Sequence, residues 1–332
     1  MSLPERYKKV RVKQRGADPH QQLVIVDVPM PMPRPYEIVV KNHYAGVNDT
    51  DVGRMMGLDD WSHPVPFDFG VEALGEVVAI GDKVRDYAVG DSVISALPGN
   101  GYGEYTVIDQ NFVARVPALD PKYVGVFISG TTAKIALEFV ANIQSTETVM
   151  VTGALSASGH FAVQLAKMQG CHVIGTCANA HEASILTHLG VDQVLDRSAD
   201  DVAQVLTDEY HDMINVVFDV IGGPILAACI KNAAPRARIV LNAALHQQQN
   251  GHTPPADLYQ RLIAHSIALV GFSLSDYANA VPIESLKLLD KLQLGILHSL
   301  VDPTEFSGID TVPDAIAHMM SGASRGKVIV QL

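Results

Sequence analysis

Residues 147–167 read ETVMVTGALSASGHFAVQLAK, a short apolar run that ends in glycine and leads directly into a helical pattern. The run has the length and composition of a buried strand, and the apolar residues after it recur with helical spacing. A helix that begins this abruptly presents N–H groups without helical partners, and phosphate groups bind at such helix starts. The segment therefore predicts a strand, a phosphate-binding turn over 153–159 and a helix.

The same alternation continues for more than one hundred residues beyond this turn. Further apolar runs are CHVIGTC (171–177), INVVFDVIGG (214–223), ARIVLNA (237–243) and IALVGFSL (267–274), with helical patterns between them. Strands that are apolar along their whole length, alternating with helices, are typical of a parallel sheet covered on both faces. We expect a doubly wound α/β domain of the Rossmann type over residues 122–274.

The chain before residue 122 has a different residue pattern. Short β-branched runs at close spacing, broken by prolines and glycines, include QLVIVDVPM (22–30) and EIVVKNHYAG (37–46). Such runs predict a small barrel or sandwich. The last run, GKVIVQL (326–332), is expected to return to this part, so the β-rich domain is assigned to 1–121 and 275–332.

Length and charge narrow the class of protein. A chain of 332 residues usually forms two domains, and its formal net charge of −12 would repel nucleic acid and anionic membranes. No apolar run approaches the roughly 20 residues that span a bilayer, and the N-terminus lacks the apolar core of a secretory signal. The three cysteines, Cys171, Cys177 and Cys229, are widely spaced and are expected to be unpaired in a reducing, cytoplasmic setting. A small-molecule substrate is the expected partner.

The predicted phosphate-binding turn contains little glycine. Gly153 can make the tight turn and Gly159 can allow the helix to pack closely on the strand. Between them, Ser156, Ala157 and Ser158 are small, and the two hydroxyls can donate to phosphate oxygens. The alternative is an ordinary helix start capped by serine. The surrounding strand–helix alternation favours a working pyrophosphate site.

Several motifs in order resemble those of the medium-chain dehydrogenase/reductase superfamily, in its zinc-independent quinone oxidoreductase (zeta-crystallin) and prostaglandin reductase branch. They are GVNDTDVGRMMG (46–57), PFDFGVEALGEVVAIG (66–81), VGDSV (89–93), GEYTVI (103–108), ISGTTA (128–133), the turn above, FDVIGG (218–223) and GKVIVQL (326–332). The resemblance implies a GroES-like catalytic domain beside the Rossmann domain. It also implies transfer of hydride from a nicotinamide to a quinone or an enone, and a homodimer formed through the edge strand at 267–274.

Zinc-dependent members of this superfamily carry a cysteine and a histidine where this chain has Asn48 and Val71. The four-cysteine structural lobe is also missing, and a zinc ion needs about four nitrogen, sulfur or oxygen ligands. We therefore expect no metal site. By the resemblance, Asn48 lines the nicotinamide pocket and Thr132 contacts the cofactor. Arg54 is a candidate for stabilising an oxyanion or binding an acidic substrate, or else a solvated surface arginine.

The resemblance also implies a set of cofactor-binding residues beyond Gly153, Ser156, Ala157, Ser158 and Gly159. They are His160, Thr176, Asn179, Arg197, Ala243, Ala244, Phe272, Ser324 and Lys327. Ser324 stands where the family often has asparagine.

The choice between NADPH and NADH depends on the second strand of the Rossmann domain. It ends GTCAN, without the acid that binds the ribose in NAD sites. NADP-dependent members often have lysine where this chain has Glu182, and a glutamate would repel the 2′-phosphate. Arg197 could supply the missing cation, or could pair with Asp200 or Asp201 instead. We expect NADPH, with NADH not excluded, and a second hypothesis is a catalytically silent binding or scaffold protein.

Overall fold

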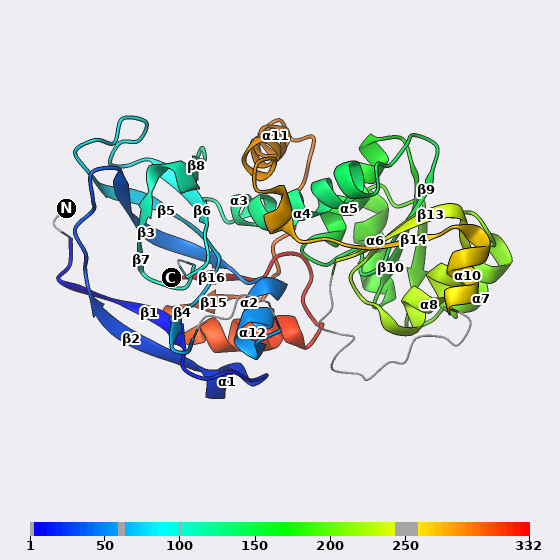
Figure 1. Ribbon diagram of the computed structural model, residues 1–332, viewed down its shortest axis with the longest axis horizontal. Coiled ribbons are helices and arrows are strands. Elements are labelled where there is room, and N and C mark those ends of the chain that lie inside the picture. The colour runs from blue at the N-terminus through cyan, green and yellow to red at the C-terminus, as the bar shows by residue number, and fades with distance from the viewer. Residues whose placement is uncertain (1–2, 59–63, 100, 243–257) are drawn as a thin grey trace. The chain divides into compact units, whose positions relative to one another are not determined.

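The computed structural model describes residues 3–58, 64–99, 101–242 and 258–332, which form two compact units (Figure 1). The first, here called the β-rich unit, comprises Met1–Ile128 and Ser299–Leu332, and the second, the parallel-sheet unit, comprises Ser129–His298. The predicted α/β class, with a β-rich domain and a parallel Rossmann-type sheet, is confirmed. The chain passes from one unit to the other within a single helical stretch, Lys122–Val140.

The β-rich unit contains a seven-stranded sheet in the order β15-β16-β3-β5-β6-β8, with β7 paired to β3. Its strands are β3 (Glu37–Gly46), β5 (Glu72–Ile80), β6 (Ser92–Ala96), β7 (Tyr105–Asp109), β8 (Val113–Arg115), β15 (Phe306–Ser307) and β16 (Ile329–Gln331). The C-terminal strand β16 pairs antiparallel with the end of β3, as the sequence predicts. This pairing brings the residues just before β16 to the carboxyl end of β3. The helices of the unit are α1 (Pro19–Gln22), α2 (Asp49–Met56), α3 (Lys122–Gly125) and α12 (Val312–Met320).

A second, three-stranded sheet of this unit includes a strand that the sequence analysis did not identify. β1 (Arg6–Val12) lies between β2 (Leu23–Pro29) and β4 (Phe67–Asp68). Tyr7, Val10 and Val12 are buried among the basic residues of this strand. Val10 and Val12 follow the period of two of a half-exposed strand, but Tyr7 does not, and the adjacent Lys8 and Lys9 interrupt the pattern in the sequence.

The parallel-sheet unit has six strands in the order β11-β10-β9-β12-β13-β14, all parallel. They are β9 (Thr148–Val151), β10 (His172–Cys177), β11 (Gln193–Asp196), β12 (Ile214–Asp219), β13 (Ala233–Leu241) and β14 (Ala268–Gly271). Chain order reverses between β9 and β12, because the chain runs outward from β9 to β11 and then crosses back to β12. Ligands of open parallel sheets bind at the carboxyl ends of the strands at such a point.

Helices cover both faces of this sheet (Figure 1). They are α4 (Thr131–Lys134), α5 (Gly159–Met168), α6 (Ala180–His188), α7 (Val202–Glu209), α8 (Gly223–Lys231), α10 (Leu258–His265) and α11 (Val281–Gln293). α7 and α8 pack on a core that includes Met150, Ile174 and Val217 from the central strands. The apolar pattern that predicts the strands is thus explained by burial on both sides.

The helical stretch Lys122–Val140 is the one described helix long and apolar enough to cross a membrane by length and composition. Its most apolar window is 72% buried inside the protein, which is the behaviour of a core helix. It is irregular, because π-helical turns at Val126–Gly130 and Ile135–Val140 alternate with α3 and α4.

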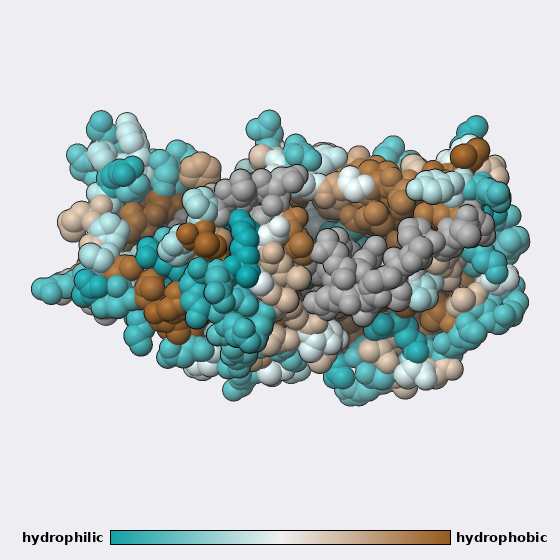
Figure 2. Space-filling model, turned by 60° about the horizontal axis from the view of Figure 1, so that its bottom comes forward, coloured by the Kyte–Doolittle hydropathy of each residue, from teal (hydrophilic) through white to brown (hydrophobic). Residues whose placement is uncertain are grey.

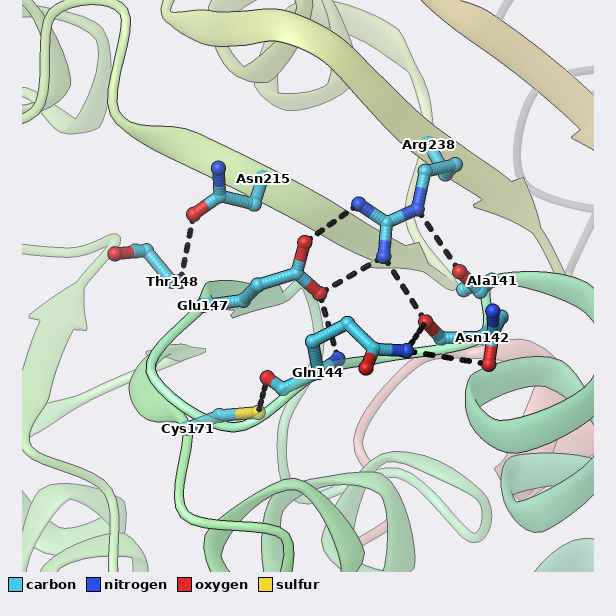
Figure 3. A network of polar contacts seen from close by, with 8 residues as sticks. All are labelled: Ala141, Asn142, Gln144, Glu147, Thr148, Cys171, Asn215 and Arg238. Carbon is cyan, nitrogen blue, oxygen red and sulfur yellow. Dashed lines mark hydrogen bonds and ion pairs between the residues drawn. The ribbon is translucent and has the colours of Figure 1, made fainter.

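At the amino end of β9, Arg238 holds the loop that precedes the strand (Figure 3). Its Nη1 and Nη2 donate to the two carboxylate oxygens of Glu147 at 2.7 and 2.8 Å, and its Nε donates to the carbonyl oxygen of Ala141 at 2.9 Å. Burial raises the pKa of Glu147, but the hydrogen bonds from Arg238 and from the Gln144 N–H outweigh it and hold the pKa below its usual range. This network fixes the loop at the amino end of β9, which is the end of the sheet opposite the carboxyl ends of the strands.

Candidate functional site

The turn after β9 adopts a conformation that requires glycine. Gly153 has a φ of +62°, and a Cβ there would lie 2.6 Å from a methyl carbon of Val220. Its N–H donates to the hydroxyl of Thr176, at 2.8 Å, on the neighbouring strand β10. Gly153 therefore makes the tight turn expected of it, and the hydrogen bond to the buried Thr176 holds this turn against β10.

Gly159 begins α5 and has no space for a side chain. A Cβ at this position would lie 2.3 Å from the carbonyl oxygen of Gly153 and 2.8 Å from the hydroxyl oxygen of Ser156. The constraint is close packing, since Gly159 does not have a positive φ. The helix start is thus pressed onto the turn, as in sites where backbone approaches a pyrophosphate closely.

The two serine hydroxyls in the turn both accept hydrogen bonds from the protein. Ser156 Oγ accepts from the Gly159 N–H at 3.0 Å, and Ser158 Oγ accepts from Asn242 Nδ2 at 2.9 Å. A hydroxyl that accepts from an N–H keeps its own proton to donate elsewhere. Both serines are only partly buried, as is Ala157. The turn therefore presents two oriented O–H donors, which suit phosphate oxygens.

Thr152 and Asp219 join the two central strands under the turn, and the sequence analysis did not single them out. The Thr152 hydroxyl donates to Asp219 Oδ1 at 2.7 Å and accepts from the Val220 N–H at 2.9 Å. Asp219 Oδ1 also accepts from the Gly222 N–H at 3.0 Å. Burial raises the pKa of Asp219 although these hydrogen bonds oppose it. The pair fixes the carboxyl ends of β9 and β12 at the switch point.

At the end of β10, the side chain of Asn179, which was predicted to bind the cofactor, is hydrogen-bonded to Glu182. Asn179 Oδ1 accepts from the Glu182 N–H at 3.3 Å, and Asn179 Nδ2 donates to Glu182 Oε1 at 3.0 Å. Glu182 Oε2 accepts from the Ala178 N–H at 2.8 Å. Asn179 is therefore the N-cap of α6, and the carboxylate of Glu182 is engaged by two N–H donors.

Arg197 follows β11 and is exposed beside the end of β10. Its backbone N–H and its Nε both donate to the carbonyl oxygen of Cys177, at 3.0 and 3.2 Å. Within the described part of the chain it forms no ion pair with Asp200 or Asp201, since Asp200 Oδ2 accepts from the Asp196 N–H and Asp201 caps α7. The alternative of a local ion pair is therefore wrong.

The remaining predicted cofactor residues lie in several places. His160 is fully buried, with its ring 4.0 Å from that of Phe161, and Thr132 is half-buried on α4. Phe272 is half-buried and packs edge-on against Tyr277. Ala243 and Ala244 lie outside the described residues. Ser324 and Lys327 belong to the β-rich unit.

A buried ionic cluster occupies the carboxyl end of β3 in the β-rich unit. Lys327 Nζ lies 2.8 Å from Glu72 Oε2, and both side chains are fully buried. Lys327 Nζ also donates to Asn48 Oδ1 at 2.5 Å, while Asn48 Nδ2 lies 3.3 Å from Glu72 Oε2 and 3.2 Å from the Gly46 carbonyl oxygen. Lys327, predicted from the resemblance to meet the cofactor, is enclosed in this cluster.

Asp51, on the first turn of α2, adds a second carboxylate near the cluster. Its Oδ2 accepts from the Tyr102 hydroxyl at 2.9 Å and from the Asn48 N–H at 3.0 Å. Complete burial raises the pKa of Asp51 to about 7, even though these hydrogen bonds and the charges of Lys327 and Arg54 lower it. Asp51 is therefore protonated for part of its population at neutral pH.

Arg54 is buried, with 4% of its surface exposed, so the alternative of a solvated surface arginine is wrong. Its guanidinium lies over the ring of Phe67, 5.2 Å from the ring centre. The neighbouring Met55 is fully buried and packs in the core. The three cysteines are also buried and unpaired, in line with their reading as small apolar residues.

Comparison with known proteins identifies the family. Residues 34–137 match the family described as alcohol dehydrogenase GroES-like domain, and residues 157–291 match the family described as zinc-binding dehydrogenase. The chain is 31% identical to prostaglandin reductase-3 of Mus musculus, over all of this chain and 91% of that protein. It belongs to the medium-chain dehydrogenase/reductase superfamily, in the zinc-independent quinone oxidoreductase and prostaglandin reductase branch.

Two further relatives span the whole chain. A probable quinone oxidoreductase of Leishmania amazonensis is 31% identical over the full length of both chains. The solved structure of a mycobacterial protein complexed with NADPH is 26% identical, covers 98% of this chain and 100% of its own, and superimposes with a TM-score of 0.83.

The zinc in one family description raises the question of whether this medium-chain reductase could hold the metal. At the two positions compared with zinc ligands, Asn48 offers an amide and Val71 is a buried apolar side chain. The Lys327 ammonium lies beside Asn48 Oδ1 and Glu72 Oε2, where its positive charge opposes a second cation. Among the described residues, no three histidine, cysteine, aspartate or glutamate side chains are grouped as a metal site would require. These residues do not fit a zinc ion.

Proposed function

We propose that this protein is an NADPH-dependent, zinc-independent reductase that transfers hydride to a quinone or to the β-carbon of an α,β-unsaturated carbonyl compound. The observation that carries the proposal is the turn at the switch point, where Gly153 and Gly159 fit closely and two serine hydroxyls are oriented as donors that suit a phosphate. The names of the relatives support it, because one is a prostaglandin reductase, another a probable quinone oxidoreductase, and a third binds NADPH.

The chain's own residues have separate tasks in this proposal. The bound nicotinamide supplies the hydride, which is chemistry that the protein side chains do not provide. The turn and the start of α5 bind the pyrophosphate, and Thr152 with Asp219 keeps the two strands beneath it in place. The side chains thus mainly orient the reacting groups, which is where much of the rate gain of such enzymes originates.

The preference for NADPH over NADH is assigned to Arg197. Its Nε is held by the Cys177 carbonyl oxygen, so the other guanidinium nitrogens can meet a 2′-phosphate at the carboxyl end of β10. Glu182, which would repel that phosphate, is 7% exposed and bound by the N–H groups of Ala178 and Asn179. A phosphate would therefore meet the exposed arginine first.

Binding of the two nucleotides to purified protein tests this proposal. Arg197→Ala is expected to weaken NADPH binding about tenfold, because one solvent-exposed, charge-assisted contact is lost, and to leave NADH binding unchanged. Nicotinamide fluorescence in titrations gives both dissociation constants, and Arg34→Ala is the control because that arginine is exposed in the other unit. Turnover is then assayed with a 1,4-quinone and a straight-chain enone. If wild-type protein binds neither nucleotide, the reductase proposal fails and a silent scaffold takes its place.

We further propose a homodimer formed by pairing of β14 with its copy. β14 is an edge strand of the parallel sheet, and Ala268, Leu269 and Gly271 on it are exposed. On α10, Tyr259 and Ile263 expose 74% and 80% of their surfaces. Apolar surface is visible on the side of the molecule that carries this sheet (Figure 2). An apolar edge with unpaired backbone groups is a template for a second strand.

Light scattering after size exclusion tests the dimer. The chain has a mass of 35.7 kDa, so a dimer of 2 × 35.7 kDa, or 71.4 kDa, is expected for the wild type. Leu269→Lys combined with Ile263→Lys should give a monomer, since each copy would bring two buried charges to the interface. Leu294→Lys is the control, because Leu294 is 74% exposed at the end of α11. A wild-type mass of one chain would contradict the proposal.

A further inference from the structure

Ser158 directly precedes α5, but its hydroxyl does not cap that helix. Among the described residues, no N–H of the first turn of α5 donates to Ser158 Oγ, whereas Ser156 Oγ accepts from the Gly159 N–H at 3.0 Å. Ser158 Oγ instead accepts from Asn242 Nδ2 at 2.9 Å, and this is its one hydrogen bond within the described part of the chain. The hydroxyl of Ser158 is therefore held from outside the turn.

Asn242 comes from a distant part of the chain. It directly follows β13, and its backbone N–H donates to the carbonyl oxygen of Asp219, at the end of β12, at 2.8 Å. In the sheet, β12 lies between β9 and β13, so the side chain of Asn242 reaches past the end of β12 to the turn that follows β9. The two hydrogen bonds of Asn242 thus join the carboxyl ends of three strands around the switch point.

The chemistry of a phosphate decides what Ser158 needs as a partner. A serine hydroxyl has one proton to donate and two positions at which it accepts. An ionised phosphate oxygen only accepts, so a bound diphosphate takes the Ser158 proton and leaves Oγ to accept from a donor. The amide of Asn242 supplies that donor through Nδ2. A carboxylate or carbonyl oxygen in the same place would take the proton itself, so the asparagine suits a serine that donates to an anion.

We propose that Asn242 is a positioning residue, which holds the Ser158 hydroxyl so that its proton is directed to the diphosphate of the nucleotide. The role assigned to Asn242 rests on the proposed reductase function and deepens it. In a turn with little glycine, phosphate binding depends on side-chain donors as well as on backbone N–H groups. One of these donors is oriented by a partner 84 residues away. Because NADPH and NADH carry the same diphosphate, Asn242 affects both, unlike Arg197.

Titrations of the full-length protein with each nucleotide test this role. Asn242→Ala is expected to weaken the binding of NADPH and NADH by the same factor, roughly five- to tenfold, because the donor to a charged group loses its orientation. The control is Asn215→Ala, which should keep wild-type affinity. Asn215 is also half-buried in the parallel-sheet unit, but its Oδ1 accepts from the Thr148 N–H, at 2.9 Å, at the amino end of the sheet (Figure 3).

A double-mutant cycle shows whether Asn242 acts through Ser158. If it does, Asn242→Ala should have almost no further effect in Ser158→Ala protein, which already lacks the hydroxyl. Asn242→Asp keeps the shape of the side chain but only accepts, so it should take the Ser158 proton and weaken binding more than Asn242→Ala. Repulsion between the new carboxylate and the diphosphate persists in Ser158→Ala protein, whereas the part of the loss that is due to the hydroxyl disappears there.

The outcomes separate this role from the proposed function. If the wild type binds neither nucleotide, the reductase proposal and the role of Asn242 are both wrong. If the wild type binds and the effects of Asn242→Ala and Ser158→Ala multiply, Asn242 acts independently of the hydroxyl and its positioning role alone is overturned. Wild-type affinity in Asn242→Ala would overturn it as well. Urea unfolding without nucleotide checks that each variant is folded under the conditions of the titration.

Discussion

Gly159→Ala is expected to reduce NADPH affinity by at least about tenfold and to lower the free energy of unfolding by about 1–3 kcal/mol. A Cβ at position 159 would lie 2.3 Å from the carbonyl oxygen of Gly153, which is backbone and cannot rotate away. The turn or the start of α5 must therefore move. Either movement disturbs the bond from the Gly159 N–H to Ser156 Oγ, which orients one of the two hydroxyl donors.

The control for this substitution is Gly130→Ala in the same unit. A Cβ at Gly130 would meet its nearest atoms, on Leu288 and Phe161, at 3.4 and 3.6 Å, which are ordinary contacts. Alanine is also preferred over glycine within helices, so this variant should be as stable as the wild type or more so. Urea unfolding and NADPH titration are measured on both variants. Wild-type affinity in Gly159→Ala would show that the turn does not contact the nucleotide.

Much of this turn could be predicted from the sequence, because its constraints are local. The apolar runs and helical spacing around 147–167 define the strand and the helix, and only glycine tolerates the backbone at 153 and the packing at 159. The bond from Thr152 to Asp219 could not be predicted in the same way. It joins residues on two strands that are far apart in the chain, and their adjacency follows from the strand order.

The buried ionic cluster in the β-rich unit could not be predicted from local sequence. Asn48 and Lys327 were identified from the resemblance and Glu72 was not, and an isolated sequence places charged residues such as Glu72 and Lys327 on the surface. They are buried because antiparallel pairing brings Gly46 opposite both Glu72 and Ile329, which places Lys327 beside Glu72. The sequence features that include these residues are two short motifs, GVE (70–72) and GK (326–327). Neither motif by itself indicates an ion pair.

The sequence around Asn179 is compatible with two roles, helix capping and cofactor binding, and spacing does not decide between them. Asparagine three residues before glutamate is a helix-capping pattern, and in this chain that asparagine is also a predicted cofactor-binding residue. In the structure the capping role uses both its oxygen and its amide nitrogen. The side chain of Asn179 therefore caps the helix, and the proposed recognition of a 2′-phosphate is built on Arg197.

Asp51→Asn is expected to make the protein more stable than the wild type at pH 8, by up to roughly 4 kcal/mol, and about equally stable at pH 4. Burial raises the pKa of Asp51 from its ordinary value of 3.8 to about 7. Between these values the unfolded chain has lost the proton while the folded protein keeps it. The contribution of Asp51 to the free energy of unfolding is therefore fully present below pH 3.8, falls as the pH rises, and is lost above pH 7.

Asparagine imitates the protonated form of Asp51 and does not titrate, so the variant should lack this pH dependence. Its side-chain oxygen can still accept from the Tyr102 hydroxyl and the Asn48 N–H, which both bind Asp51 Oδ2. Urea unfolding midpoints at several pH values from 4 to 8 give the comparison, and Asp276→Asn is the control because that carboxylate is exposed. The other titrating groups are common to both proteins and cancel in the difference. If Asp51→Asn is less stable than the wild type at every pH, the buried carboxylate is ionised throughout, with Lys327 and Arg54 compensating its charge fully.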